Sequence, residues 1–361
     1  AGTYQPQAVR QKLIEKEDGS ARMLGIPTVV DRLIQQALLQ KLQRLYDPEF
    51  SEHSHGFRPR RSAHGALKEA REHVRGGRRW VVDVDLSKFF DRVDHDILMG
   101  RLAKRLGDKR LLGLIRRYLT AGMMVEGAVE VRDQGTPQGG PLSPLLANIL
   151  LDEVDKELER RGHRFVRYAD DSRVFVGSMR AGKRVMRLLR RLYGKLKLVI
   201  NEDKSAVALF SERAFLGYQM YEDRYVDIGF RPSKKSEARL KARVRKATGR
   251  KVGVRIERVV EWLRPRLIGW RNYFKLTTSH IALRNLGGWI RHRFRALQLS
   301  QWKNCRTIAR RLRALGASER LVARVTAFHG RWWYAAGGAS TSVLTNRFFD
   351  AMGLPRLATC P

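Results

Sequence analysis

The stretch Tyr168-Ala169-Asp170-Asp171 lies between the apolar pair Phe165-Val166 and a second strand-like run at residues 173–177. Two short apolar runs on either side of paired acids predict a tight β-hairpin with carboxylates at its tip. Adjacent aspartates repel each other and have low β-propensity, so we expect a cation at this turn, with a divalent metal as the first candidate. Because aspartate is common in turns, the hairpin alone leaves an ordinary turn open as an alternative.

A third acid, Asp85, ends the predicted strand from Trp80 to Leu86. Alternation along this strand puts Val81, Asp83 and Asp85 on one face. If the strand neighbours the acidic hairpin in one antiparallel sheet, Asp85 converges with the two hairpin acids. Asp83 shares its face, and we interpret it as either a residue that supports the metal ligands or a purely structural one. Such oxygen ligands suit Mg²⁺. Two Mg²⁺ ions held there would activate a 3′-hydroxyl and stabilise leaving pyrophosphate.

The charge of the chain predicts a nucleic-acid partner. Its 361 residues include 72 Lys and Arg against 36 Asp and Glu, a formal net charge of +36 that is spread along the chain. A protein this cationic is expected to bind a polyanion. No apolar run reaches the roughly 20 residues of a membrane span, so we expect no membrane partner. With no signal-peptide core and no paired cysteines, we expect a cytoplasmic protein without a zinc module, and we interpret His53 and His55 as loop residues.

The pattern of elements changes near residue 230. Before it, predicted strands alternate with helices, the first of which Asp31 can cap. A predicted hairpin at residues 215–228 closes this α/β part, and Ser233 then opens a helix after which we expect no strands. The sequence therefore predicts an α/β domain followed by a basic, all-helical one.

Basic residues near the predicted acids are candidates for holding a nucleoside triphosphate. Lys16 and Arg22 flank a predicted hairpin tip at residues 18–20, and Lys204 follows the polar run 201–203. Gln138 lies in the glycine-rich loop 135–141, where it can line a base or sugar pocket. Each cation taken singly also fits a solvated surface position.

The helix that follows Ser233 predicts an RNA-binding surface, because its apolar stripe is thin and its other faces are basic. An ordinary solvated face is the alternative. The candidate RNA-binding residues are Arg239, Lys241, Arg243, Arg245 and Lys246.

Taken in order, these motifs resemble bacterial group II intron-encoded reverse transcriptases, also called maturases. The resemblance covers nearly the whole chain and is carried by seven ordered blocks. These blocks are 22–32, 54–63, 85–91, 135–148, 168–171, 215–218 and 264–274.

The resemblance implies a right-hand polymerase fold of the α/β (α+β) class. It implies fingers at 1–80, a palm at 81–230 with interleaved fingers elements, an α-helical thumb or maturase domain at 231–310, and a helical DNA-binding region at 311–361. It also assigns roles within these regions. By this resemblance Asp85, Asp170 and Asp171 hold the two Mg²⁺ ions, Lys16, Arg22 and Gln138 contact the nucleotide, Phe90 screens out a ribose 2′-hydroxyl, and Phe215, Leu216, Gly217 and Tyr218 form the primer grip.

The resemblance implies an RNA-dependent DNA polymerase that also binds its intron RNA during splicing and retrohoming. Its expected partners are group II intron RNA, an RNA template with a DNA primer, target DNA and dNTPs, and we expect a monomer or weak dimer. The absence of paired cysteines resembles the class C members, which have no endonuclease domain. The usual N-terminal extension is expected to be short or trimmed. A domesticated relative acting in DNA repair or phage defence, and a splicing factor with an inactive polymerase, remain the alternatives.

Overall fold

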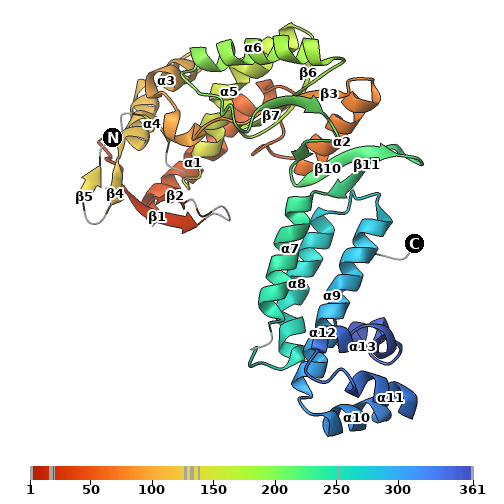
Figure 1. Cartoon of the computed structure of the whole chain (residues 1–361). Helices are drawn as coiled ribbons and strands as arrows, with labels where there is room; N and C mark the ends of the chain where they lie inside the picture. The colour runs from red at the N-terminus through yellow and green to blue at the C-terminus, as the bar shows by residue number, and fades with distance from the viewer. Residues whose placement is uncertain are drawn as a thin grey trace. The chain divides into compact units, whose positions relative to one another are not determined.

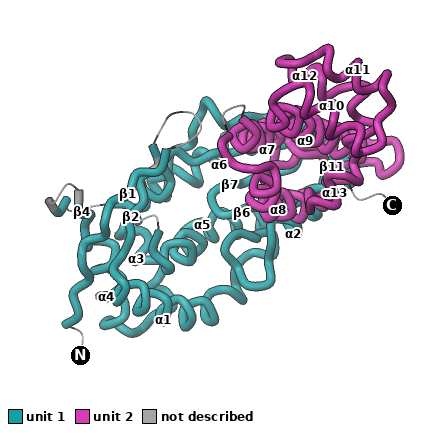
Figure 2. Tube along the Cα trace, turned by 90° about the horizontal axis from the view of Figure 1, so that it is seen from below, with its two compact units in different colours: residues 1–213 teal, residues 214–361 magenta. Residues whose placement is uncertain are grey.

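The computed structural model describes residues 3–15, 19, 21–125, 128–130, 134–136, 139–249 and 252–358. The chain forms two compact units, residues 1–213 and 214–361 (Figure 2). The division lies before the hairpin at residues 215–228 rather than near residue 230. That hairpin belongs to the second unit because Tyr218 packs against Phe274, with ring centroids 4.8 Å apart.

The first unit combines helices with two sheets (Figure 1). Its elements are β1 (Val9–Glu15), β2 (Ala21–Ile26), α1 (Val29–Tyr46), η1 (Asp47–Glu49), α2 (Ala63–Arg75), β3 (Trp80–Val84), η2 (Phe89–Arg92), α3 (His95–Ala103), α4 (Lys109–Thr120), β4 (Met123–Val125), β5 (Ala128–Glu130), α5 (Ser143–Arg160), β6 (Arg164–Tyr168), β7 (Asp171–Val176), α6 (Met179–Lys195) and β8 (Ala206–Leu209).

The central sheet of this unit has the strand order β6-β7-β3-β8, and all of its neighbours are antiparallel. Its face bearing Val82 and Val174 forms one buried core with α5 and α6, while α2 packs against β6 and β7. Burial of these branched side chains supplies the main driving force for the unit. The antiparallel sheet predicted from the sequence is therefore confirmed.

The second sheet contains the hairpin predicted near residues 18–20. β1 and β2 pair antiparallel from Arg10↔Ile26 to Glu15↔Ala21, and most of the tip lies outside the described residues. Helix α1 follows this hairpin. Its N-cap is Thr28, whose hydroxyl accepts from the backbone N–H of Asp31, so the predicted capping role of Asp31 is wrong. Asp31 instead accepts a hydrogen bond from the Thr28 hydroxyl at 2.6 Å.

The second unit begins with a three-stranded sheet and continues as helices. Its elements are β9 (Ala214–Phe215), β10 (Tyr218–Asp223), β11 (Asp227–Pro232), α7 (Lys234–Ala247), α8 (Ile256–Tyr273), α9 (His280–Gln301), α10 (Cys305–Ala314), α11 (Glu319–Thr326), α12 (Trp332–Ala335), η3 (Gly338–Ser342) and α13 (Asn346–Ala351). Ser233 caps α7 as predicted, and the described residues beyond β11 form no further strand.

The core of the second unit is separate from that of the first. Leu240 and Val244 of α7 lie against Leu263 of α8 and Phe294 of α9, and all four are buried. Within the part of the chain that the structure describes, no helix has both the length and the apolar character needed to cross a membrane.

Candidate active site

The pairing of β3 with β7 aligns the acids predicted from the sequence. Val84 lies opposite Ser172 in this register, so the next step brings Asp85 beyond the end of β3 opposite Asp171. Asp170 precedes Asp171 in the turn between β6 and β7. The three acids therefore gather at one end of two adjacent strands, although they lie about 85 residues apart in the chain.

The turn that carries Asp170 is held in a left-handed conformation. Tyr168 pairs with Asp171, which leaves Ala169 and Asp170 as a two-residue turn, and Ala169 has φ +59°. Such a turn matches the twist of the strands that it joins, although it costs energy for a residue with a Cβ atom. Gly56 lies directly against this turn. A Cβ added at position 56 would stand 2.2 Å from the Ala169 nitrogen, so only glycine allows this approach.

A buried ion pair supports the turn at Ala169 and Asp170. Arg167 and Asp155 are each 1% exposed, with 2.6 Å between Nη2 and Oδ2. The same guanidinium donates to the Ala169 carbonyl at 3.0 Å and to the Asn148 side-chain oxygen at 2.8 Å. Asn148 in turn donates to the Gly56 carbonyl at 2.9 Å. This network ties α5, the Gly56 loop and the acidic turn together. Sequence reasoning missed it, although an arginine within an apolar strand was a signal.

Two guanidinium groups lie beside the acids. Asp83 forms one ion pair with Arg173 at 3.2 Å and another with Arg213 at 2.7 Å, so both guanidinium groups contact this acid. Nε of Arg173 also lies 3.8 Å from the Asp171 carboxylate. Arg173 and Arg213 therefore balance part of the negative charge that the sheet concentrates here.

Burial, together with the neighbouring charges, shifts the pKa values of Asp85 and Asp171. Burial raises the pKa of Asp85, which the Lys204 ammonium opposes and the Asp170 carboxylate reinforces. Burial raises the pKa of Asp171 to about 7, against the attraction of Arg173 and with repulsion from Asp83 and Asp170. The Asp171 side chain is still 41% exposed, so water reaches it. A bound cation would reduce the repulsion among these crowded carboxylates and lower their pKa values.

The donor chemistry of this site fits Mg²⁺, which prefers carboxylate oxygens and retains several water ligands. Within the described part of the chain, the ligand atoms of Asp85, Asp170 and Asp171 do not all lie within 4.8 Å of one another. The three carboxylates are therefore more widely spaced than the ligands of a closed metal site.

The structure describes only some of the predicted nucleotide-binding residues. Lys16 and Gln138 lie outside the described residues, and the side chain of Arg22, which stands opposite Ile14 in β2, is not described. Lys204 lies close enough to Asp85 to lower its pKa against the effect of burial.

Phe90 lies in η2 and is partly buried, with its ring 5.1 Å from that of Phe89. The glycine-rich loop docks against this segment. The Thr136 N–H donates to the Phe90 carbonyl at 2.7 Å, and a Cβ at Gly135 would meet the Asp91 carbonyl at 2.9 Å. The loop and Phe90 are therefore held side by side.

The predicted primer-grip residues form a tight turn within the second unit. Phe215 pairs with Tyr218, and both Leu216 and Gly217 have positive φ. The Gly217 carbonyl accepts from Ser236 at 2.9 Å, and the Leu216 carbonyl accepts from Tyr273 at 2.8 Å. The turn is thereby anchored to α7 and α8.

The five candidate RNA-binding residues of α7 fall into two groups. Lys241 and Arg245 lie over the ring of Trp289 at 5.9 and 5.4 Å. Arg239, Arg243, Arg245 and Lys246 are exposed, and Lys241 is partly buried. Lys241 and Arg245 therefore also contact the Trp289 ring of α9.

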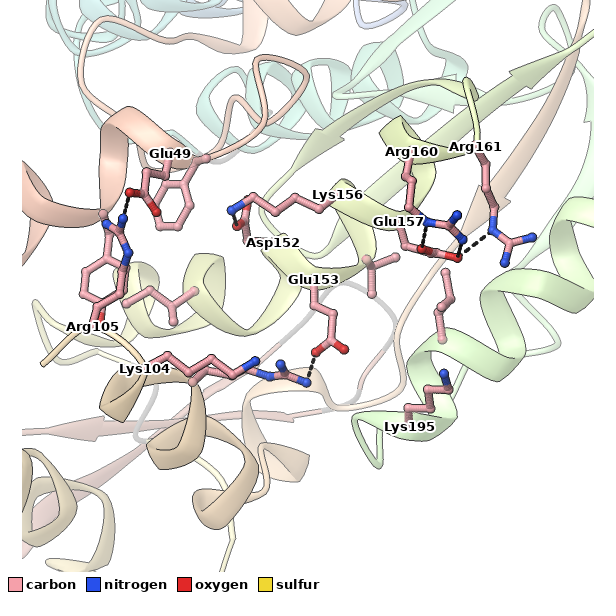
Figure 3. Close-up of a pocket in the computed structure, with 16 residues that line it drawn as sticks. Glu49, Lys104, Arg105, Asp152, Glu153, Lys156, Glu157, Arg160, Arg161 and Lys195 are labelled. Atoms are coloured by element: carbon pink, nitrogen blue, oxygen red, sulfur yellow. Dashed lines mark hydrogen bonds and ion pairs between the residues drawn. The ribbon is translucent and has the colours of Figure 1, made fainter.

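A cavity of about 720 Å³ lies elsewhere on the first unit, between α3, α5 and the end of α1 (Figure 3). None of the three candidate acids lines it. Its own acids are paired with cations, as in Glu157 with Arg160 and Arg161, and Asp152 with Lys156. Because its acids are already paired, this cavity does not compete with the acidic turn as a candidate active site.

Comparison with known proteins identifies the class. Residues 14–220 match the family described as reverse transcriptase (RNA-dependent DNA polymerase). This match covers more than half of the chain, so the chain belongs to the reverse transcriptase family. Residues 238–316 match the group II intron, maturase-specific domain. The chain is thus a member of the group II intron reverse transcriptase/maturase family, which confirms the resemblance seen in the sequence.

Curated relatives agree with this placement. Group II intron-encoded protein LtrA of Lactococcus lactis is 33% identical over 289 residues, covering 61% of this chain and 48% of LtrA. Protein YkfC of Escherichia coli is 32% identical over 266 residues, covering 62% of this chain and 69% of YkfC. The chain thus spans about half the length of LtrA. Apo telomerase from Candida tropicalis has a TM-score of 0.51 at 14% identity, covering 94% of this chain and 65% of the telomerase chain, and supports the fold alone.

Proposed function

We propose that this protein is an RNA-dependent DNA polymerase that extends a DNA primer on an RNA template by two-metal nucleotidyl transfer. The observation that carries the proposal is the β3–β7 register, which brings Asp85 opposite Asp171 beside the turn bearing Asp170. Membership of the reverse transcriptase family supports the same reaction.

In this proposal Asp85, Asp170 and Asp171 hold the two Mg²⁺ ions. When bound, these ions supply activation of the primer 3′-hydroxyl and charge stabilisation of the leaving pyrophosphate. The protein's own contribution is placement, because phosphoryl transfer depends mainly on positioning and charge neutralisation. Arg167 and Asn148 hold the turn, while Arg173 limits the repulsion among the acids.

Phe90 is proposed to select the sugar of the incoming nucleotide. The Thr136 N–H donates to the Phe90 carbonyl, which ties the backbone that carries this ring to residues 135–136. Lys16, Arg22, Gln138 and Lys204 are proposed as triphosphate and base contacts, and residues 215–218 as the primer grip. The proposed fingers, palm, thumb and DNA-binding regions are those expected from the sequence.

The maturase-specific match supports group II intron RNA as the second partner. Exposed cations on α7 supply phosphate contacts in this proposal, and the protein acts in splicing and retrohoming with target DNA and dNTPs as further substrates. We place it in the bacterial cytoplasm as a monomer or weak dimer, which cell fractionation and analytical ultracentrifugation would test.

The deciding experiment is primer extension on an RNA template with dNTPs, with and without Mg²⁺, beside a splicing assay with the RNA that flanks the gene. Mg²⁺-dependent cDNA synthesis together with stimulated splicing would support the proposal. Stimulated splicing without any cDNA would contradict the polymerase assignment. Synthesis without a splicing effect would contradict the maturase role.

A further inference from the structure

We propose that His53, Glu69 and His73 form a binding site for a divalent transition-metal ion, with Zn²⁺ the best match, separate from the catalytic acids. Each residue offers one ligand atom, and these atoms all lie within 4.8 Å of one another. Among the described residues they are the one set of three potential ligands that meets this spacing. The inference stands apart from the proposed polymerase function, which uses none of these side chains.

The local structure brings the three ligands together. Glu69 and His73 stand four residues apart on α2, so they share one face of the helix. His53 lies in the preceding loop, whose backbone is bonded to β6. The Arg167 N–H donates to the His53 carbonyl at 2.9 Å, and the His55 N–H donates to the Arg167 carbonyl at 2.8 Å. Both sides of the site are therefore placed by regular structure.

The donor atoms suit Zn²⁺, which is commonly bound by imidazole nitrogens and carboxylate oxygens. Nδ1 of His53 contacts Oε1 of Glu69, and Nε2 of His73 lies 3.5 Å from the same oxygen. That nitrogen of His73 is buried and, among the described residues, has no hydrogen-bond partner. A metal ion between the three groups would be coordinated by the lone pair of this nitrogen.

A fourth residue supports the carboxylate from outside. Nε2 of His55 lies 2.6 Å from Oε2 of Glu69, the oxygen that the other two imidazoles do not contact. Metal sites commonly use such an outer hydrogen bond to orient a ligating carboxylate. The arrangement thus has two imidazole ligands, one carboxylate and an orienting partner.

The surroundings leave one side of the cluster open. The His53 ring packs against Phe165 at 5.0 Å and the His73 ring against Phe175 at 5.4 Å, so aromatic residues of β6 and β7 line its inner side. The side chains of His53 and Glu69 are 23% and 22% exposed. Water can therefore complete a tetrahedral set of ligands.

The position of the site suggests what the ion does. It would tie α2 to the loop that contains His53, and Gly56 of the same loop lies against the acidic turn. The expected role is therefore structural: the ion stabilises the loop on which the catalytic turn rests.

The test uses the full chain after removal of bound metal with a chelator. Titration calorimetry with ZnCl₂ in excess Mg²⁺ should show one Zn²⁺ per chain, and Zn²⁺ should raise the melting temperature. His73→Gln and Glu69→Gln should each weaken Zn²⁺ binding by more than about 100-fold, since loss of even an outer partner costs about 10–100-fold. His64→Gln, on the same helix, is the matched control and should bind like the wild type.

Co²⁺ binding to the wild-type chain provides a measurement that does not depend on the folding of any variant. Visible absorption bands typical of tetrahedral Co²⁺ would support the site. Absence of stoichiometric Zn²⁺ binding, absence of these bands, or unchanged affinity in folded His73→Gln would each overturn the proposal, whatever the polymerase assay shows.

Discussion

Residues 1–213 contain 41 Lys and Arg beside 28 Asp and Glu, whereas residues 214–361 contain 31 Lys and Arg against 8 Asp and Glu. In the first unit, key acids sit in defined pairs, such as Asp155 with Arg167 and Asp83 with Arg173. In the second unit, exposed cations such as Arg243 and Lys246 far outnumber the acids. We therefore expect the properties of the first unit to depend on the positions of a few charged residues, and those of the second unit on its total number of cations. Single substitutions should be severe in the first unit and graded in the second.

The largest effect is expected at the acidic turn. Asp170→Ala should lower Mg²⁺-dependent primer extension by about 10³-fold or more, the scale seen when a group that stabilises transition-state charge is removed. RNA affinity should remain unchanged because the second unit is intact. Asp96→Ala, which removes an exposed acid of the same unit, is the control and should extend primers normally. Retained extension by Asp170→Ala would remove the metal assignment.

The next effect concerns the stability of the first unit. Arg167→Met leaves Asp155 buried without its partner, which should cost about 3–5 kcal/mol in the free energy of unfolding. Urea denaturation followed by tryptophan fluorescence would measure this loss. Arg160→Met breaks an exposed pair with Glu157 and should cause no measurable change. If the two variants were equally stable, burial of the Arg167 pair would not be what fixes the turn.

Sugar selection should change by a smaller factor. Phe90→Val should reduce the preference for dNTPs over rNTPs by about 10–100-fold, because removing part of an apolar side chain alters discrimination on that scale. Single-nucleotide incorporation kinetics with each sugar would show it. Phe328→Val, at an exposed phenylalanine of the second unit, serves as the control. Unaltered selectivity in Phe90→Val would leave this residue a packing role only.

The second unit should respond in a graded way. Combined alanine substitution of Arg239, Arg243 and Lys246 should lower the slope of log RNA affinity against log salt by about 2–3 units, because each phosphate that is no longer neutralised reduces the slope by roughly one. Binding titrations at several salt concentrations give this slope. A charge-matched control replaces Arg258, Arg313 and Arg160, each of which is paired with a carboxylate. Equal slopes for the two triple variants would place the RNA surface elsewhere.

The smallest effect is a pH dependence of stability in the first unit. The folded pKa of Asp171 lies at about 7, above its ordinary value of 3.8, so the folded state retains a proton that the unfolded state has released. Stability of the Mg²⁺-free protein should therefore fall as pH rises between these two values. Between about pH 5 and about pH 8, the melting temperature of Asp171→Asn should fall by less than that of the wild type. A larger loss in the variant would reverse the sign and contradict the shift.

The sequence predicted that the acids would lie together because this inference needs only the residue types and the alternation of a short strand. Asp85 and the turn at Asp170 were found in this way. The support beneath them was not found, because Arg167 and Asp155 are 12 residues apart on a strand and a helix whose packing no local pattern reveals. The same holds for His53, which the sequence placed in a loop without its partners Glu69 and His73.

The predicted boundaries of the first unit and of helix α1 differed from the structure for the same reason, because contacts distant in sequence or competing caps decide them. The hairpin β10–β11 was assigned by its strand pattern to the α/β part, yet Tyr218 packs on Phe274, a contact across 56 residues of sequence. Helix α1 begins at Val29 and is capped by Thr28 rather than by Asp31, since the Thr28 hydroxyl accepts from the Asp31 N–H.

The central position of β3 bears on how the protein is made. This strand leaves the ribosome early, but its neighbour β7 follows some 90 residues later and β8 later still. Until both have been synthesised, β3 has unpaired edges and Asp85 has no partner acids. Because domains generally fold as units during synthesis, a nascent chain that stops before residue 206 holds an incomplete sheet that is open to aggregation. The sheet that carries Asp85 and the acidic turn is therefore complete only after residue 209 has been synthesised.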